Sequence, residues 1–354
     1  MEHTISRDEG QHVYVGIDVA KKSWKVSIHG EVLEHKTFSQ PPSVDVLVQY
    51  LRRSFPGARV HCAYEAGFSG YWICEQLREH QIDCLVANPA DIPTKDRERA
   101  FKTDRVDARK IARSLRNGEL DPIFVPDRQA QEDRTLVRLR WSLVRKQTRC
   151  KNQIKSLLAF YGIGVSPDGI DAYWSRRFLA YLDAQRLHYA SGDAVLQTLL
   201  AELRMYRQMI SETTRKIRTL AEQERYREAV GYLRSIPGIS TLTAMTLLTE
   251  LVDIDRFKSP DQLASYIGLV PGSHSSGEDD VETGLSHRRN TFLRFVLIES
   301  AWMAARYDPA LLKAFEVLAK RMPKQQAIVR IARKLLNRIR YVLLHHTTYV
   351  FATR

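Results

Sequence analysis

The chain has 354 residues, of which 44% are hydrophobic and 27% are charged. This is the composition of a globular protein, and the length predicts two or three domains. The sequence contains no apolar run of about 18 residues, and its first residues lack the basic and apolar regions of a signal peptide. We therefore expect a cytoplasmic protein with no membrane partner. The four cysteines form no C-x-x-C pair, so we expect reduced thiols and neither a zinc site nor a disulfide framework.

The net charge of +13 is unevenly distributed along the chain. Lys and Arg outnumber Asp and Glu by 19 to 11 in residues 128–230 and by 14 to 3 in residues 286–354. The corresponding counts are 18 against 19 in residues 1–127 and 3 against 8 in residues 231–285. Such clustering indicates a polyanionic partner, and nucleic acid is the first candidate. The alternative is a solvated basic face that binds no ligand.

Residues 13–117 alternate between patterns that are typical of strands and of helices. Strands are predicted at 13–19, 24–29, 34–38, 60–65 and 82–87, and helices at 44–54, 70–80 and 101–115. Three consecutive strands, the first two joined as a hairpin, are followed by alternating helices and strands. This order predicts an α/β domain.

Two aspartates stand three residues apart in the helical pattern of FKTDRVDARKIARSL. In a helix, this spacing places the carboxylates of Asp104 and Asp107 on one face, with their Cβ atoms about 5–6 Å apart. Two acids this close repel each other unless a cation or a proton lies between them. The alternative is structural: Asp104 complements the helix dipole, and Asp107 pairs with Lys110 or Arg105 on a solvated face.

Two further acids occupy unusual positions. Asp18 interrupts the apolar strand pattern of residues 13–19, and Glu65 ends the strand pattern of residues 60–65. A buried acid needs a partner, because its isolated charge is costly to desolvate. A ribonuclease-H-like fold would bring these acids together with Asp104 and Asp107, to hold two Mg²⁺ or Mn²⁺ ions for in-line phosphoryl chemistry.

The middle of the chain is predicted to be two long helical arms. Residues 128–161 are rich in leucine, isoleucine and basic residues without a proline, which is typical of a coiled-coil-like helix. Glycines and a proline interrupt the pattern after residue 161, and a second helical run covers residues 194–232. The two arms are expected to pack on each other, on a second protomer, or both. Their basic faces could also lie along nucleic acid.

A mostly α C-terminal domain begins with LRSIPGISTLTAMTLLTEL, residues 233–251. Pro237 and Gly238 form a short turn between two helical patterns, which resembles a helix-hairpin-helix motif whose backbone N–H groups meet a phosphate. A plain turn between two packed helices is the alternative reading.

Ser276 lies in a predicted loop, in the sequence Ser-Ser-Gly at residues 275–277. A hydrophilic turn would explain this serine equally well. As a nucleophile, Ser276 would need a base and a cationic clamp on the phosphate. The spacing does not choose among the candidate helpers nearby in sequence, which are His274, His287, Arg288, Arg289 and Arg294.

Seven segments occur in the order found in a known family: GIDVAKKSW, YEAGFSGYW, VANPADI, KTDRVDARKIA, LRSIPGIS, LASYIGLVPGSHSSGE and LSHRRNTFLR. Over residues 13–345, the chain resembles the DEDD transposases of the insertion sequence 110 type, which are also called bridge-RNA-guided recombinases. The resemblance implies a RuvC-like catalytic domain at 1–127, helical dimerisation arms at 128–230 and a C-terminal transposase domain at 231–354.

The resemblance also implies roles for particular residues. Asp18, Glu65, Asp104 and Asp107 correspond to the metal-binding acids of the family, and Ser276 to its nucleophile, which becomes joined to a DNA 5′ phosphate. Nucleic-acid contacts are expected from Pro237, Gly238, Arg288, Arg289 and Arg294. The implied partners are donor and target DNA, a structured guide RNA that pairs with both DNAs, and further copies of the chain in a dimer or tetramer of a bacterial or archaeal cell.

Two departures from the family pattern stand out. Arg289 precedes Asn290 where the family usually has glycine, and residues 277–284, GEDDVETG, are acidic where relatives are often basic. Two other functions remain open on the sequence. One is a metal-dependent junction resolvase that hydrolyses DNA with water, and the other is a nucleic-acid-binding protein without catalytic activity.

Overall fold

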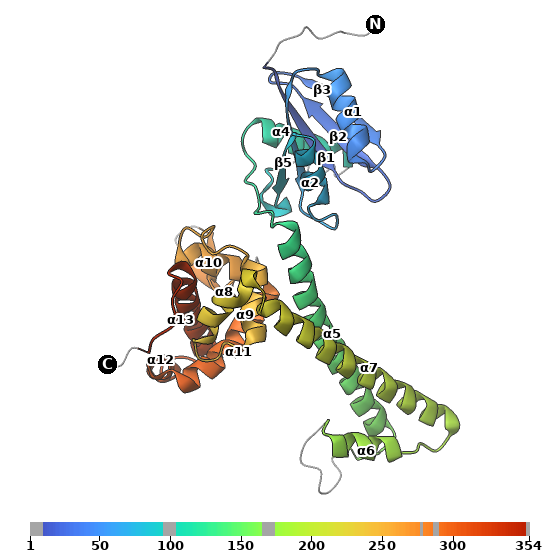
Figure 1. Cartoon of the computed structure of the whole chain (residues 1–354), viewed down its shortest axis with the longest axis vertical. Helices are drawn as coiled ribbons and strands as arrows, with labels where there is room; N and C mark the ends of the chain where they lie inside the picture. The colour runs from blue at the N-terminus through green and yellow to red at the C-terminus, as the bar shows by residue number, and fades with distance from the viewer. Residues whose placement is uncertain (1–9, 95–103, 165–173, 277–278, 286–289, 352–354) are drawn as a thin grey trace. The chain divides into compact units, whose positions relative to one another are not determined.

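In the computed structural model, the described residues are 10–94, 104–164, 174–276, 279–285 and 290–351 (Figure 1). Residues 105, 271–276 and 279–285 are described by their backbone alone. The chain divides into two compact units, Met1–Val125 and Pro126–Arg354. Across the described segments, every helix is too short or too polar to cross a membrane.

The first unit is built on a mixed five-stranded sheet in the order β3-β2-β1-β4-β5. β1, β2 and β3 pair antiparallel, whereas β4 is parallel to β1 and β5 is parallel to β4. The α/β prediction is confirmed. The strands are β1 His12–Asp18, β2 Trp24–His29, β3 Glu34–Gln40, β4 Arg59–Glu65 and β5 Asp83–Ala87.

Helices cover both faces of this sheet. Alternate residues of β1, Val13, Val15 and Ile17, share a buried core with α1 (Val44–Ser54) and α2 (Trp72–Glu79). On the other face, Ala63 and Ala87 pack with Ile111 of α4 (Asp104–Arg116). A short 3-10 turn, η1 (Pro89–Asp91), follows β5.

The second unit contains two long helices that pack along each other, α5 (Arg128–Phe160) and α7 (Ala190–Ala221) (Figure 1). The first arm matches the prediction. The predicted run 194–232 is wrong as a single helix, because the chain breaks at Glu222 and Gln223 before α8 (Glu224–Arg234) begins. The break turns α8 so that Tyr226, Val230 and Leu233 enter the C-terminal core. Near the distal end, α6 (Arg176–Ala184) closes a smaller apolar core.

The C-terminal part of this unit is mostly helical, as predicted. Its core also contains Val137 of α5 and Ile217 of α7, which anchors both arms. The loop predicted around Ser276 is wrong, because residues 271–276 and 279–285 form two antiparallel strands, here called the β6–β7 ribbon. Backbone pairing holds this ribbon although no apolar alternation marks its sequence. The elements are α9 Thr241–Leu251, α10 Pro260–Ile267, β6 Pro271–Ser276, β7 Asp279–Leu285, α11 Thr291–Tyr307, α12 Pro309–Ala319 and α13 Lys324–Leu344.

Candidate active site and nucleic-acid surface

The four predicted acids come together at one edge of the sheet. Asp18 ends β1 and Glu65 ends β4, and the two strands are parallel neighbours. Asp104 and Asp107 lie in the first turn of α4. The helix reaches this edge because β1 has glycine at position 16, where a Cβ atom would lie 2.3 Å from the carbonyl oxygen of Ala108. Gly16 therefore lets the backbone of α4 lie directly on the strand.

The electrostatics of Asp18 show that the four carboxylates interact. The pKa of Asp18 is raised to about 6, first by burial and then by the neighbouring charges of Asp104, Asp107 and Glu65. The donor set consists of hard carboxylate oxygens, which Mg²⁺ and Mn²⁺ prefer, so these residues fit a divalent cation.

A lysine lies within this cluster of acids. The ammonium of Lys110 is 3.1 Å from Oδ1 of Asp107 and 3.5 Å from Oε1 of Glu65, and only 9% of its side chain is exposed. The Asp107–Lys110 pair that the sequence left open is therefore present, but Lys110 is buried and Asp107 is partly buried, whereas the sequence placed the pair on a solvated face. In this conformation, no three ligand-type side chains among the described residues converge closely enough to hold a metal ion.

The predicted residues of the C-terminal domain are only partly described. Ser276 is the last residue of β6, and its backbone pairs with that of Asp279 in β7. Arg294 is partly buried on α11. Arg288 and Arg289 lie outside the described residues, as does His287, and His274 is described by its backbone alone.

The Pro237–Gly238 turn joins α8 to α9 and packs on α11. Gly238 has a φ of +86°, and a Cβ atom there would lie 2.6 Å from the carbonyl oxygen of Ser300. The glycine is therefore required by helix packing, which is the plain-turn alternative that the sequence left open. A phosphate contact by this turn stays a prediction.

A buried carboxylate ties α5 to the segment that follows the β6–β7 ribbon. Glu250 of α9 is fully buried, and it accepts two hydrogen bonds from the guanidinium of Arg138, at 2.6 and 2.8 Å. Its Oε2 also accepts a hydrogen bond from Nδ2 of Asn290 at 2.8 Å. Asn290 caps α11 by accepting a hydrogen bond from the backbone N–H of Leu293. The sequence contained one signal for this site, a single acid in the apolar run of residues 241–251.

Replacing Glu250 by alanine is expected to lower the free energy of unfolding by about 3 kcal/mol, because the half-exposed Arg138 and the partly buried Asn290 lose the buried carboxylate that accepts their hydrogen bonds. Urea denaturation measures this loss. Glu228→Ala, which removes an exposed acid of the neighbouring helix α8, serves as the control and should change stability by less than about 0.5 kcal/mol. Equal effects of the two substitutions would show that the buried pair contributes nothing measurable.

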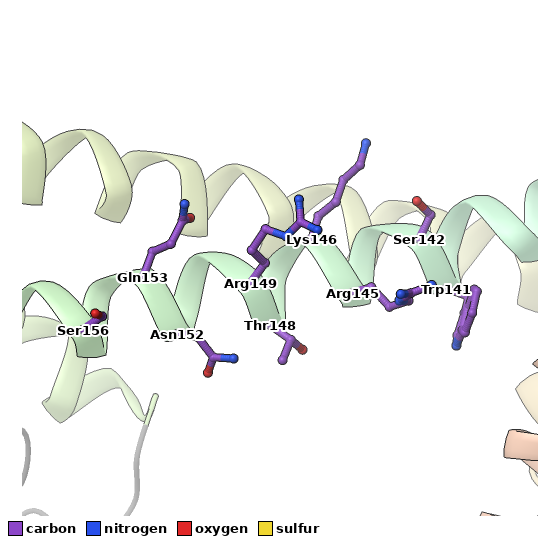
Figure 2. Close-up of a pocket in the computed structure, with 9 residues that line it drawn as sticks. All are labelled: Trp141, Ser142, Arg145, Lys146, Thr148, Arg149, Asn152, Gln153 and Ser156. Atoms are coloured by element: carbon purple, nitrogen blue, oxygen red, sulfur yellow. The ribbon is translucent and has the colours of Figure 1, made fainter.

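One face of α5 forms a long polar groove. Residues 134–160 contain eight Lys or Arg residues and no Asp or Glu. A hollow of about 720 Å³ runs along this face, and Figure 2 shows its side chains following one another along the helix from Trp141 to Ser156. Among them, Arg145, Lys146 and Arg149 are exposed. The groove therefore presents concentrated positive charge to solvent.

A second hollow adjoins this groove. It has a volume of about 640 Å³ and shares Trp141 and Ser142 with the first. It reaches Asn290 and Thr291 at the start of α11, a few residues after β7 ends.

Comparison with known proteins places these features in a family. A transposase model of the IS116/IS110/IS902 family matches residues 230–316, and a DEDD transposase model of the IS110 type matches residues 15–163. A putative transposase of Sinorhizobium fredii, y4qE, is 31% identical over 303 residues, covering 84% of this chain and 73% of the relative. The chain belongs to the IS110/IS116/IS902 transposase family. Its N-terminal part is a DEDD transposase domain.

Two further relatives agree with this assignment. The transposase for the insertion sequence element IS1533 of Leptospira borgpetersenii is 30% identical over 68% of this chain and 70% of its own length. A second putative transposase of Sinorhizobium fredii, y4rJ, is 27% identical over 92% of this chain and 90% of its own length. As a transposase, the protein is an enzyme that binds DNA, cleaves its strands and transfers them, and DEDD domains in general use divalent metal ions.

Proposed function

We propose that this transposase excises and inserts a mobile element through two sets of residues. Asp18, Glu65, Asp104 and Asp107 hold Mg²⁺ or Mn²⁺ on a RuvC-like domain, and Ser276 is the nucleophile that becomes joined to DNA. The observation that carries the proposal is that Asp104, Asp107 and Glu65 lie near enough to Asp18, at the carboxyl ends of β1 and β4, to raise its pKa. The experiment that tests it is a search for a covalent protein–DNA adduct that depends on Ser276.

The proposed step exchanges one phosphoester bond for another. Oγ of Ser276 forms a bond with phosphorus, and the bond from phosphorus to a sugar oxygen breaks, so that the DNA 5′ phosphate stays on the serine. The proton of the serine hydroxyl passes to a base, for which His274 and His287 are candidates, and the leaving sugar oxygen takes up a proton. A divalent cation, when bound by the four acids, offsets the charge that builds up on the phosphoryl oxygens. Because the phosphoester is retained, the strand can be rejoined without an external energy source.

We also propose that an element-encoded structured RNA guides the enzyme and that the α5 groove holds a nucleic-acid backbone. Arg145, Lys146 and Arg149 are exposed along the helix, and the adjoining hollow extends to Asn290 and Thr291 at the start of α11. These contacts are made with phosphates and carry no sequence information. Base pairing by the RNA would supply sequence recognition, as in other RNA-guided enzymes.

Neutralising the groove is expected to reduce the salt dependence of nucleic-acid binding. Each phosphate contact releases counterions, so Arg149→Gln should lower the slope of log K against log salt by about one, and Lys146→Gln with Arg149→Gln by about two. Titrations with duplex DNA and with RNA, each over a range of salt concentrations, measure the slopes and identify the ligand. Arg204→Gln on α7, whose guanidinium pairs with Asp183, is the control. Unchanged slopes in the double variant would place the nucleic acid elsewhere.

Self-association into a dimer or tetramer is proposed through the helical arms. Val195, Met205 and Met209 of α7 are 41–48% exposed, although they are apolar. A second copy that covers these side chains would remove them from water. A recombinase must also hold more than one DNA end, which favours more than one protomer.

A nuclease that uses water is the second candidate function. The four acids assemble within the first unit from elements of that unit alone. Such a site could direct hydrolysis without any contribution from Ser276. The two candidates differ in the product, because hydrolysis leaves free DNA ends and no protein attached.

A further inference from the structure

Lys110 is the feature of the acid cluster that a plain metal site does not explain. It follows Asp107 by three residues on α4, so both side chains project from the same face of the helix. Its ammonium contacts Asp107 and, from the neighbouring strand β4, Glu65. Lys110 as a whole is 7% exposed, which is rare for a lysine unless it is paired with acids.

The ammonium already contacts two of the four carboxylates that would hold a divalent ion. A metal ion bridging Glu65 and Asp107 would share both carboxylates with Lys110, and two cations on the same carboxylates repel each other. Among the described side chains, the ion pairs of Lys110 place a cation on Glu65 and Asp107 and none on Asp18 or Asp104.

We propose that Lys110 is the resident cation of the acid cluster, so that the two metal positions differ in their affinity for divalent ions. The first divalent ion is held on the side of Asp18 and Asp104 while Lys110 neutralises Glu65 and Asp107. A second ion binds only when the Lys110 ammonium withdraws from those two carboxylates. This inference rests on the proposed function, because it requires that the four acids bind metal.

The test measures Mn²⁺ binding to the full-length protein without nucleic acid, by electron paramagnetic resonance of free Mn²⁺ and by calorimetry. The wild-type protein should bind one Mn²⁺ and, much more weakly, a second. Lys110→Met keeps most of the buried stem but removes the charge, and it should tighten the second site at least tenfold. Lys110→Arg keeps a cation at the position and should retain the inequality of the two sites.

Thermal unfolding supplies a second readout. Without metal, Lys110→Met should have a lower Tm than the wild type, since Glu65 and Asp107 lose their cation, and added Mn²⁺ should raise its Tm more than that of the wild type. Lys36→Met removes an exposed lysine of the same unit and should match the wild type in both measurements.

The outcomes separate this inference from the function on which it rests. If Mn²⁺ binds to the wild type and to Lys110→Met with the same stoichiometry and affinity, the role of Lys110 is overturned while the metal site stands. If neither protein binds Mn²⁺, the proposed metal site fails and this inference fails with it. If Lys110→Met does not fold, Lys110→Arg decides: two equal sites in that variant would contradict the proposal.

Discussion

Replacing Asp104 by alanine is expected to abolish DNA strand cleavage while nucleic-acid binding stays within about twofold of the wild-type value. The carboxylate lies in the first turn of α4, where its charge contributes to the raised pKa of Asp18, so it belongs to the acid cluster. Removing one of the proposed ligands of a catalytic metal leaves the charge on the phosphoryl oxygens without its counter-charge. Cleavage of labelled DNA, measured beside a binding titration, separates the two effects.

Asp121→Ala provides a matched control, because Asp121 is an exposed acid of the same unit outside the cluster. It should cleave at the wild-type rate. An excess of chelator should stop the wild-type enzyme as completely as Asp104→Ala does, and Mn²⁺ or Mg²⁺ should restore it. Cleavage that persists in Asp104→Ala, or in chelator, would remove the metal site from the mechanism.

Replacing Ser276 by alanine is the second change with a large expected effect, and it should eliminate strand exchange. Without the serine hydroxyl, no phosphoester links the protein to DNA, so a cleaved strand cannot be rejoined by the reverse reaction. The recombined DNA junction, amplified from a reaction containing element DNA and the RNA encoded at its locus, measures this loss. Ser275→Ala should retain most of the activity, because its hydroxyl is not the proposed nucleophile.

If Ser276 and the four acids serve the same chemical step, the effects of replacing them should not be additive. Asp104→Ala combined with Ser276→Ala should therefore be no less active than either single variant, which is the non-additivity expected of groups that serve one step. Strand exchange by Ser276→Ala at the wild-type rate would leave the serine without a catalytic role.

The sequence was sufficient to predict the sheet of the first unit and the proximity of its four acids. Alternating apolar residues and turn signals placed β2 and α1 at the bounds that the structure has, 24–29 and 44–54. Acids at the ends of two strands could be expected to meet, since parallel neighbours end at the same edge. The role of Gly16 could not be predicted from the sequence. It depends on close contact with Ala108 and Ala112 of α4, which lie 92 and 96 residues further along the chain.

The second unit was harder to predict because tertiary packing decides where its elements end. Glu222 and Gln223 are neither glycine nor proline, and yet the helix breaks there so that Tyr226 and Val230 reach the core. The β6–β7 ribbon has no apolar alternation, so the sequence around Ser276 looked like a loop.

Buried charges were the other features that sequence patterns could not resolve. Lys110 was a candidate partner of Asp107, but its burial depends on how α4 lies against β4. Glu250 meets Arg138 and Asn290 only in the folded chain, from 112 and 40 residues away. In both cases, the partners are fixed by the three-dimensional structure and leave no periodic signal in the sequence.

The measurement that tests the proposed mechanism most directly is a denaturing gel of the transposase with labelled DNA that carries the element junction, in the presence of the locus RNA and Mg²⁺. We expect a shifted band that disappears on protease treatment. This band should form with the wild type and with Ser275→Ala, and it should be absent with Ser276→Ala and with Asp104→Ala. Cleavage by Ser276→Ala that yields free 5′ phosphates at the wild-type rate, with no adduct in any lane, would contradict a covalent serine intermediate and favour a nuclease that uses water.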